Sequence, residues 1–413
     1  MNKVIVLGIS DAGPQALPEA ARTLIAKATL IVGGERHLGF VKDHKAEKLT
    51  LKGNLKEVAL RLEQELNKPD SRPLILASGD PLFYGIGRFL AEKLGAEKLQ
   101  IHPAPSSMQL AFARAGLSWQ DADLISVHGR EIESLGAARP GSTRLGIFTD
   151  AHNDPSACAL FLLASGWPTD AKAWVCENLE GADEKVTACA LGELPGKKFG
   201  ELNVVVVDRP APSSLRTEYL MGLDDALFAQ RKPEKGLITR AEIRLLSVSK
   251  LRLFPGAKVW DIGAATGSVA IEAARLSRSG RVWAVEKNEE DCANIRENAT
   301  RFGLPQLKVL HGAAPAVLAQ IPEADAPDAV FVGGSSGKMS EILDLCATRL
   351  VSGGSIVVNT VTLENGAEAL EWYKGSGFDW DCMQVQVSRR KPILDLNRFE
   401  ALNPVTIFWG TKR

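Results

Sequence analysis

Short apolar runs alternate with amphipathic stretches along the chain, and this pattern predicts strands and helices. In the first 116 residues, runs of Val, Ile and Leu predict strands, and stretches with apolar residues every three or four positions predict helices. The strands are expected at 3–8, 29–34, 73–79 and 99–105, and the helices at 18–28, 54–67, 86–95 and 107–116. Strands that alternate with helices favour an α/β fold in which helices cover a parallel sheet.

After residue 116 the apolar runs lie closer together, with fewer helical stretches between them. Strands are expected at 123–129, 144–150, 173–179 and 202–210, with a helix at 155–166. This pattern predicts a mixed α/β subdomain over about 106–210, beside a first subdomain over about 1–105. A cleft between two such subdomains is a natural ligand site.

A segment rich in proline and charge follows, and we expect residues 211–236 to be a linker. A third alternation then begins, which predicts a second domain over 237–413 with a Rossmann-like, mostly parallel sheet. Its expected helices are 240–250, 268–277, 289–302, 338–350 and 364–376, and its expected strands are 257–262, 281–286, 307–311, 328–333 and 354–360. The last two apolar runs, 381–390 and 403–410, are too close for a crossover helix, so they predict an antiparallel hairpin.

Composition narrows the possible partners. The 413 residues suffice for two or three domains, and 49 basic against 50 acidic side chains give a net charge of -1. This balance offers no electrostatic reason to expect a nucleic acid or a membrane as partner. The N-terminal apolar run is too short for a signal peptide, so we expect a cytoplasmic protein. Six scattered cysteines without zinc-site spacing predict neither a disulfide framework nor a metal site.

The stretch "VWDIGAATGS" (259–268) ends a predicted strand and opens a helix, which is where doubly wound sheets bind ligands. Gly263 and Gly267 allow backbone to approach a ligand closely. A dinucleotide site would place a pyrophosphate here, but Asp261 would repel a pyrophosphate and attract an ammonium. S-adenosylmethionine has an ammonium and no phosphate, so we favour it over a dinucleotide. Glu286 ends the next strand and suits the ribose of either ligand.

A second candidate loop lies in the first half, in "SGDPLFYGIG" (78–87). Gly79, Asp80 and Pro81 could form an ordinary turn. One strand later, however, Ser106 and Ser107 bring two hydroxyls to the start of a helix. A helix N-cap explains the hydroxyl of Ser106, but not both hydroxyls. We therefore expect this loop and these serines to form a second binding site.

The first 210 residues resemble the tetrapyrrole methylase family, with the matching pieces "VLGISDAG", "SGDPLFYG", "APSSMQLAFARAG", "SVHGR", "CENLEGADE" and "LNVVVVDRP". Residues 237–376 look like a class I methyltransferase, with "LITRAEIRLLSVSKLRL", "DIGAATGSVAIEAARL", "VEKNEE", "HGAAP" and "FVGGSSGKM". Together the two halves resemble the fused precorrin-6B methyltransferases (decarboxylating) of cobalamin biosynthesis.

The resemblance implies a bifunctional enzyme that uses one S-adenosylmethionine in each domain. It would methylate precorrin-6B at ring carbons 5 and 15 and decarboxylate the ring C acetate, which gives precorrin-8X. The first half would act at carbon 5, and the second half would act at carbon 15 and decarboxylate. The resemblance also implies a homo-oligomer.

The resemblance extends the cofactor site of the second half to Ala264, Thr266, Gly312 and Ala313. Two positions depart from the family pattern. Ala265 stands where the family usually has glycine, which is tolerable if its φ is negative. Ala313 stands where the family often has an acid for the adenine amino group, so adenine recognition would fall to the backbone.

Substrate carboxylates require cationic partners, and Arg240 and Arg244 lie one helical turn apart near the start of the second domain. A solvated helix face explains these arginines equally well. Gly334 and Ser335, in "GGSSG" (333–337), are expected in a substrate-facing loop. We assign no catalytic side chain, because methyl transfer from a sulfonium depends mainly on alignment.

Two other functions remain open at this point. A nicotinamide-dependent oxidoreductase would use the 259–286 unit, although only the general α/β architecture favours it. A tetrapyrrole carrier that has lost catalysis is conceivable because of Ala265 and Ala313.

Overall fold

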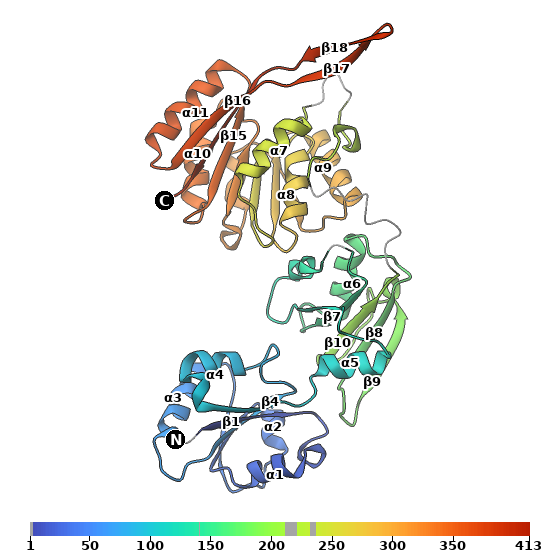
Figure 1. Cartoon of the computed structure of the whole chain (residues 1–413), viewed down its shortest axis with the longest axis vertical. Coiled ribbons are helices and arrows are strands. Elements are labelled where there is room, and N and C mark those ends of the chain that lie inside the picture. The colour runs from blue at the N-terminus through green and yellow to red at the C-terminus, as the bar shows by residue number, and fades with distance from the viewer. Residues whose placement is uncertain (1–2, 140, 211–220, 232–236) are drawn as a thin grey trace. The chain divides into compact units, whose positions relative to one another are not determined.

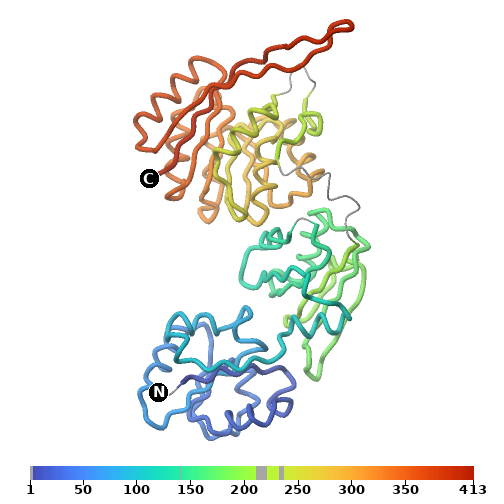
Figure 2. The backbone as a smooth tube through the Cα atoms, in the orientation of Figure 1, coloured from blue at the N-terminus to red at the C-terminus, as the bar shows by residue number. Residues whose placement is uncertain are grey.

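The computed structural model describes residues 3–139, 141–210, 221–231 and 237–413 (Figures 1 and 2). These residues cluster into two units. One unit comprises Met1–Arg130, Ser142–Ala159 and Pro168–Ala211, and the other comprises Glu131–Gly141, Leu160–Trp167 and Pro212–Arg413.

The first sheet has five parallel strands in the order β3-β2-β4-β1-β5. Its elements are β1 (Val4–Ile9), α1 (Glu19–Ala26), β2 (Leu30–Gly33), α2 (Glu35–Gly39), β3 (Glu47–Thr50), α3 (Leu55–Leu66), β4 (Pro73–Ser78), α4 (Gly87–Leu94) and β5 (Leu99–His102). Helices α3 and α4 pack on one face of the sheet, and α1 and α2 pack on the other (Figure 1). The predicted parallel sheet is confirmed. The sequence analysis missed β3 and α2, because both are short and β3 is largely polar.

The second sheet is mixed and has the order β6-β7-β10-β8-β9. Its elements are α5 (Ser107–Ala115), β6 (Asp123–Ser126), β7 (Arg144–Phe148), α6 (Pro155–Ala164), β8 (Lys172–Glu177), β9 (Lys185–Ala190) and β10 (Asn203–Asp208). β6 is parallel to β7, and the other pairs are antiparallel. The mixed arrangement confirms the prediction, which lacked β9 alone among these strands.

The third sheet has seven strands in the order β13-β12-β11-β14-β15-β19-β16. Its strands are β11 (Val259–Ile262), β12 (Val282–Glu286), β13 (Leu307–His311), β14 (Ala329–Val332), β15 (Ser355–Thr360), β16 (Asp379–Val385) and β19 (Val405–Thr411). β11 to β15 are parallel, whereas β19 runs antiparallel to both β15 and β16. The expected antiparallel ending is confirmed.

Five helices cover this sheet: α7 (Ala241–Lys250), α8 (Ser268–Leu276), α9 (Glu289–Arg301), α10 (Met339–Arg349) and α11 (Leu363–Gly375). One apolar core joins α7, α8 and α9 to the sheet, and a second core joins α10 and α11 to it. The two cores lie on opposite faces, because residues that alternate along β11 belong to different cores: Val259 to the first and Trp260 to the second. The parallel strands are therefore buried on both faces, as their continuous apolar sequences require.

The terminal hairpin is longer than expected. The predicted strand 381–390 divides into β16 and β17 (Ser388–Ile393), and β17 pairs with β18 (Leu396–Ala401) in a separate two-stranded sheet. Figure 1 shows this arm extending beyond the third sheet. Leu394, Leu396 and Phe399 on the arm are exposed, by 97%, 71% and 79%.

The linker prediction needs correction over residues 221–231, because this segment packs on the second unit. Leu223 and Phe228 are 4% exposed and belong to the core under α7 and α8. The amide of Ala229 donates to the Asn298 side chain, which in turn donates to the Ala229 carbonyl. The rest of the predicted linker, 211–220 and 232–236, lies outside the described residues.

Of the six cysteines, which are all free thiols, Cys158, Cys176, Cys292 and Cys346 are buried, Cys189 is half-buried and Cys382 is exposed. Among the described residues no cluster of His, Cys, Asp or Glu could hold a metal ion. The helices in the described part of the chain are too short or too polar to cross a bilayer.

Candidate functional site

The parallel strands β11 and β12 end side by side, and two acidic side chains near their carboxyl ends, Asp261 and Glu286, line one pocket. This pocket has a volume of about 590 Å³. It opens at the carboxyl ends of the strands, where loops from several strands meet, which is the usual ligand position in such sheets.

Most of the sequence-predicted residues of the second domain meet here. The lining includes Asp261, Gly263, Ala264, Glu286, Gly312, Ala313, Gly334, Ser335 and Arg240. Thr266 and Gly267 are not part of the lining: they are buried where the loop turns into α8, and Gly267 has a positive φ of 72°. The hydroxyl of Thr266 has no hydrogen-bond partner among the described residues.

Asp261 is a buried carboxyl of which one oxygen has no hydrogen-bond partner among the described residues. The side chain is 1% exposed, and its Oδ2 accepts a hydrogen bond from the Ala270 amide at 2.8 Å. Oδ1 is buried and has no partner within the described chain. Burial, and to a lesser extent the charge of Glu286, raises the pKa of Asp261 to about 7. A cation bound at Oδ1 would reverse this shift, so the site fits an ammonium group.

Glu286 is held by backbone and still has acceptor capacity. Its Oε2 accepts from the Ala265 amide, and its Oε1 accepts from the Asn288 amide, both at 2.9 Å. A carboxylate can accept about four hydrogen bonds, so two remain for a diol. The two backbone contacts fix the carboxylate in the pocket. This geometry fits the ribose hydroxyls of a nucleoside.

The glycine loop after β11 passes very close to the loop after β14. A Cβ on Gly263, which has φ 68°, would lie 2.6 Å from the Gly334 carbonyl oxygen. Any larger residue at position 263 would therefore push the two loops apart. Gly312 is similarly constrained, because a Cβ there would lie 2.2 Å from the Val317 side chain.

Ala265 does not meet the condition under which the sequence analysis considered it harmless. Its φ is 49°, in the left-handed region, whereas tolerance was expected at a negative φ. A Cβ in this region costs about 1–2 kcal/mol. The strained residue also presents its amide to Glu286, so the strain lies within the cofactor site itself.

Three cations among the described residues also line the pocket, and of these the sequence analysis named Arg240 alone. Arg231 is neutralised by a bidentate contact with Asp291, at 2.9 and 2.8 Å. Arg240 is 49% exposed and has a looser ion pair with Asp225 at 3.5 Å. Lys287 follows Glu286 and donates to the Ser336 hydroxyl at 2.9 Å. The only sequence feature that could have pointed to Lys287 is its position directly after Glu286, the acid that ends β12. Arg240 and Lys287 are therefore the lining cations best placed to receive a substrate carboxylate.

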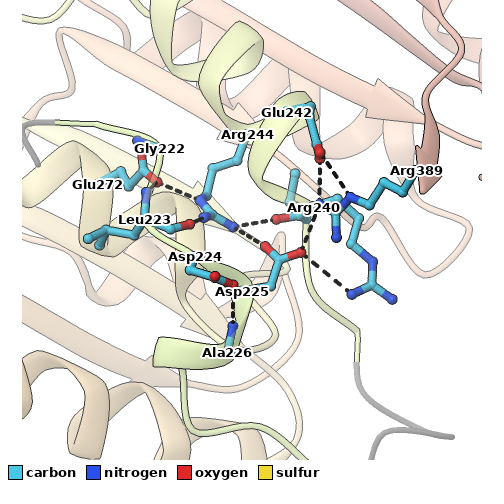
Figure 3. Close-up of polar contacts among 11 residues, drawn as sticks. Gly222, Leu223, Asp224, Asp225, Ala226, Arg240, Glu242, Arg244, Glu272 and Arg389 are labelled. Atoms are coloured by element: carbon cyan, nitrogen blue, oxygen red, sulfur yellow. Dashed lines mark hydrogen bonds and ion pairs between the residues drawn. The ribbon is translucent and has the colours of Figure 1, made fainter. Parts of the chain in front are cut away.

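Arg244 is not a substrate ligand, contrary to the sequence-based expectation. It is fully buried, and its guanidinium donates to Glu272, to Asp225 and to the backbone carbonyls of Leu223 and Thr239 (Figure 3). The Glu272 carboxylate in turn accepts from the amides of Gly222 and Leu223. Arg244 therefore fastens the 221–228 segment to α7 and α8 and does not reach the pocket.

Arg389 approaches the same network from the arm. Its guanidinium forms a bidentate contact with Glu242, and it donates to Asp225 at 3.3 Å (Figure 3). The bases of the arm, at Val387 and Leu402, line the pocket. The arm is thus tied to α7 next to the pocket.

The loop of the first unit uses its polar groups internally. Asp80 Oδ1 accepts from the Leu82 amide, which is ordinary turn chemistry, and Pro81 is buried beneath the turn. Ser106 is the N-cap of α5 and forms a capping box with Gln109. Ser107 is exposed at the first turn of the helix. In this structure Asp80 therefore acts as a turn residue and Ser106 as a helix cap, the two roles without a ligand that the sequence analysis considered.

Gly79 nevertheless brings the loop close to the start of α5. Its φ is 55°, and a Cβ there would lie 2.8 Å from Ser106 Cα. Its carbonyl accepts from the Ala104 amide, and its amide donates to Ile9. The five candidate residues Gly79, Asp80, Pro81, Ser106 and Ser107 thus lie together at the carboxyl edge of β4 and β5.

Two family models match the chain. The model of tetrapyrrole (corrin/porphyrin) methylases matches residues 3–195, and the model of the precorrin methyltransferase domain matches residues 232–412. The chain is 34% identical over 411 residues to a precorrin-6Y C(5,15)-methyltransferase [decarboxylating] of Sinorhizobium sp, covering 98% of this chain and 96% of the relative. It is 31% identical over 414 residues to the protein of the same name from Mycobacterium tuberculosis, covering 99% and 100%.

A shorter relative matches about half of the chain. The probable cobalt-precorrin-6B C(15)-methyltransferase (decarboxylating) of Sulfurisphaera tokodaii is 34% identical over 194 residues, which is 47% of this chain and 98% of the relative. The name of that protein gives methylation at carbon 15 together with decarboxylation.

Proposed function

The chain belongs to the precorrin-6Y C(5,15)-methyltransferase (decarboxylating) family, and we propose that it methylates precorrin-6B at ring carbons 5 and 15 and decarboxylates an acetate side chain. The observation that carries this proposal is the pocket formed by Asp261 and Glu286 in a chain that aligns with these relatives over nearly its whole length. The acidic pair suits a nucleoside that carries an ammonium and has no phosphate.

We assign one S-adenosylmethionine to each unit. S-adenosylmethionine would supply the methyl group from its sulfonium, which becomes the thioether of S-adenosylhomocysteine. In the second unit, Asp261 would hold the ammonium, Glu286 would hold the ribose, and backbone at Gly312 and Ala313 would meet the adenine. In the first unit, the Gly79 loop and the start of α5 would hold the cofactor through backbone groups and Ser107. The separate loops and the two separate family matches support this stoichiometry.

The same pocket offers the second unit a place for the acceptor. Arg240 and Lys287 would bind substrate carboxylates, and Gly334 and Ser335 would border the reacting edge of the macrocycle. Apolar side chains also line the pocket: Ile243, Phe331, Val387, Leu402 and Val405. An acetate held against such a surface loses hydration, which destabilises its charged form and favours loss of carbon dioxide. The protonated macrocycle would accept the electron pair of the broken C–C bond. The half-length C(15) relative supports methylation and decarboxylation at one site.

Mass spectrometry tests the proposal. The full chain, incubated with precorrin-6B and S-adenosylmethionine, should give a product that has gained two methyl groups and lost carbon dioxide. The Asp261→Asn chain should give mainly a product with the carbon 5 methyl alone, and calorimetry with S-adenosylhomocysteine should show weaker binding at one site than in the parent chain. An unchanged substrate mass with the parent chain would contradict the activity, and tight NADH binding would point instead to an oxidoreductase.

The subunit count belongs to the same proposal. We expect a homo-oligomer, which light scattering coupled to size exclusion would measure directly. A monomer across the accessible concentration range would contradict this part and leave the catalytic assignment unaffected.

A further inference from the structure

A cluster of four polar side chains lies at the carboxyl edge of the first sheet, outside the residues discussed so far. Asp11 follows β1, Arg36 and His37 lie in the first turn of α2, which follows β2, and Ser78 ends β4. The strands β2, β4 and β1 are neighbours in the sheet. Because parallel strands bring their carboxyl ends to one edge, these side chains converge there. Gly79, the first residue of the candidate cofactor loop, follows Ser78 directly.

The contacts of Arg36 orient it without using its full capacity. Nη1 donates to Asp11 Oδ2 at 3.1 Å, and Nη2 donates to Ser78 Oγ at 3.4 Å. A guanidinium has five N–H donors, so most of them remain available after these contacts with the described residues. The Arg36 side chain is 39% exposed and that of Asp11 18%, so the group is accessible and held from one side.

His37 supports this arrangement without adding charge. Its side chain is 7% exposed, and Nε2 lies 3.3 Å from Ser78 Oγ. Burial, followed by the positive charge of Arg36, lowers the pKa of His37. The imidazole is therefore neutral near pH 7, and Arg36 is the cation of the cluster. Ser78 links the two side chains and fixes the guanidinium beside the loop.

We propose that Arg36 binds a carboxylate of the tetrapyrrole in the first unit and so positions ring carbon 5 beside the cofactor loop. A planar, half-exposed guanidinium anchored by one monodentate carboxylate is suited to a second, bidentate carboxylate. The tetrapyrrole would bring that group. This inference rests on the proposed function and adds to it a substrate-binding residue in the carbon 5 half.

The test uses the full chain with three single substitutions: Arg36→Met, Arg36→Lys and, as control, Arg22→Met on the exposed face of α1. Carbon 5 methylation is located by fragment mass spectrometry at limiting and at saturating precorrin-6B. We expect R36M to raise the KM for precorrin-6B about tenfold or more, because a charged hydrogen-bonded contact is lost. R36K keeps the charge without the planar fork, so it should fall between R36M and the parent. R22M should behave as the parent.

Calorimetry with S-adenosylhomocysteine separates substrate binding from a structural effect. The proposal requires that both R36M and R36K keep the cofactor stoichiometry and affinity of the parent chain. A parent-like KM in R36M would overturn it, and so would a loss of one cofactor site in R36K, which would assign Arg36 to the loop. If the parent chain itself left precorrin-6B unchanged, the proposed function would fail first, and this inference would fail with it.

Discussion

The Arg244 guanidinium donates to the Glu272 carboxylate at 2.7 Å, and both side chains are fully buried. The pair lies between α7, α8 and the 221–228 segment. Arg244 also donates to a second carboxylate, that of Asp225. Removing one partner of a buried pair leaves a charge without compensation, which is far more costly than losing a surface contact.

The first prediction follows from this pair. Arg244→Met should destabilise the second unit by about 3–5 kcal/mol, because Glu272 would be left buried without its cation, whereas Asp225 keeps its contacts with Arg240 and Arg389. Urea unfolding followed by tryptophan fluorescence measures this change, since Trp260 lies in the same unit. An unfolding midpoint equal to that of the parent chain would contradict the structural role of Arg244.

Arg240 should behave in the opposite way, although it lies one helical turn from Arg244. It is 49% exposed, and its ion pair with Asp225 is 3.5 Å long. We expect Arg240→Met to change stability by less than about 0.5 kcal/mol, as for most surface substitutions. The KM for precorrin-6B in carbon 15 methylation should rise about tenfold, because a contact to a charged group is lost. Urea unfolding and steady-state kinetics of Arg240→Met and Arg244→Met would measure the two effects. A stability loss in Arg240→Met as large as that in Arg244→Met would contradict this prediction.

The third prediction concerns Ala265, whose φ of 49° suits glycine. In Ala265→Gly the relief of about 1–2 kcal/mol of left-handed strain exceeds the roughly 0.5–1 kcal/mol of added unfolded-state entropy, so the variant should be slightly more stable. Ala264 provides a matched control, since it is buried and its φ is not positive. Ala264→Gly should be less stable than the parent. Thermal unfolding of the two variants would decide, and a destabilised A265G would show that the strain is absorbed elsewhere.

Much of the fold follows from the sequence, because buried parallel strands have continuous apolar sequences and the helices between them have a regular apolar period. Asp261 and Glu286 could be placed in one pocket for the same reason: side chains near the carboxyl ends of neighbouring parallel strands meet at one edge. Short elements such as β3 and α2 lack a periodic signal and were missed.

Other features depend on tertiary contacts that no local pattern records. The 221–231 segment looks like a linker by composition, but Leu223 and Phe228 are buried in the core of the second unit, and Arg244 binds the Leu223 carbonyl. Arg240 and Arg244 lie one helical turn apart, and the packing of that segment determines that Arg240 is exposed and Arg244 buried. Lys287 was missed because a single lysine after a strand is unremarkable until its pocket is known.

The last prediction concerns the pH dependence of cofactor binding, which Asp261 should control. Burial raises the pKa of this carboxyl to about 7 in the ligand-free protein, with a further contribution from the charge of Glu286. An ammonium binds the ionised form, so the affinity for S-adenosylhomocysteine in the second unit should rise between about pH 6 and pH 7 and then level off. Binding below about pH 7 should release a proton, which calorimetry in buffers of different ionisation enthalpy can count.

The stability of the folded chain should also depend on pH through Asp261, but in the opposite direction to cofactor affinity. The pKa of Asp261 is higher in the folded chain than in the unfolded chain, where it is about 3.9. The folded state therefore binds more protons between the two values, and the contribution of Asp261 to stability declines as the pH rises from about 4 to about 7. Asp261→Asn should remove this slope and make cofactor affinity in the second unit weaker and independent of pH. If the affinity of D261N kept the pH dependence of the parent chain, another group would be responsible, with Glu286 the first to examine because it faces the same pocket.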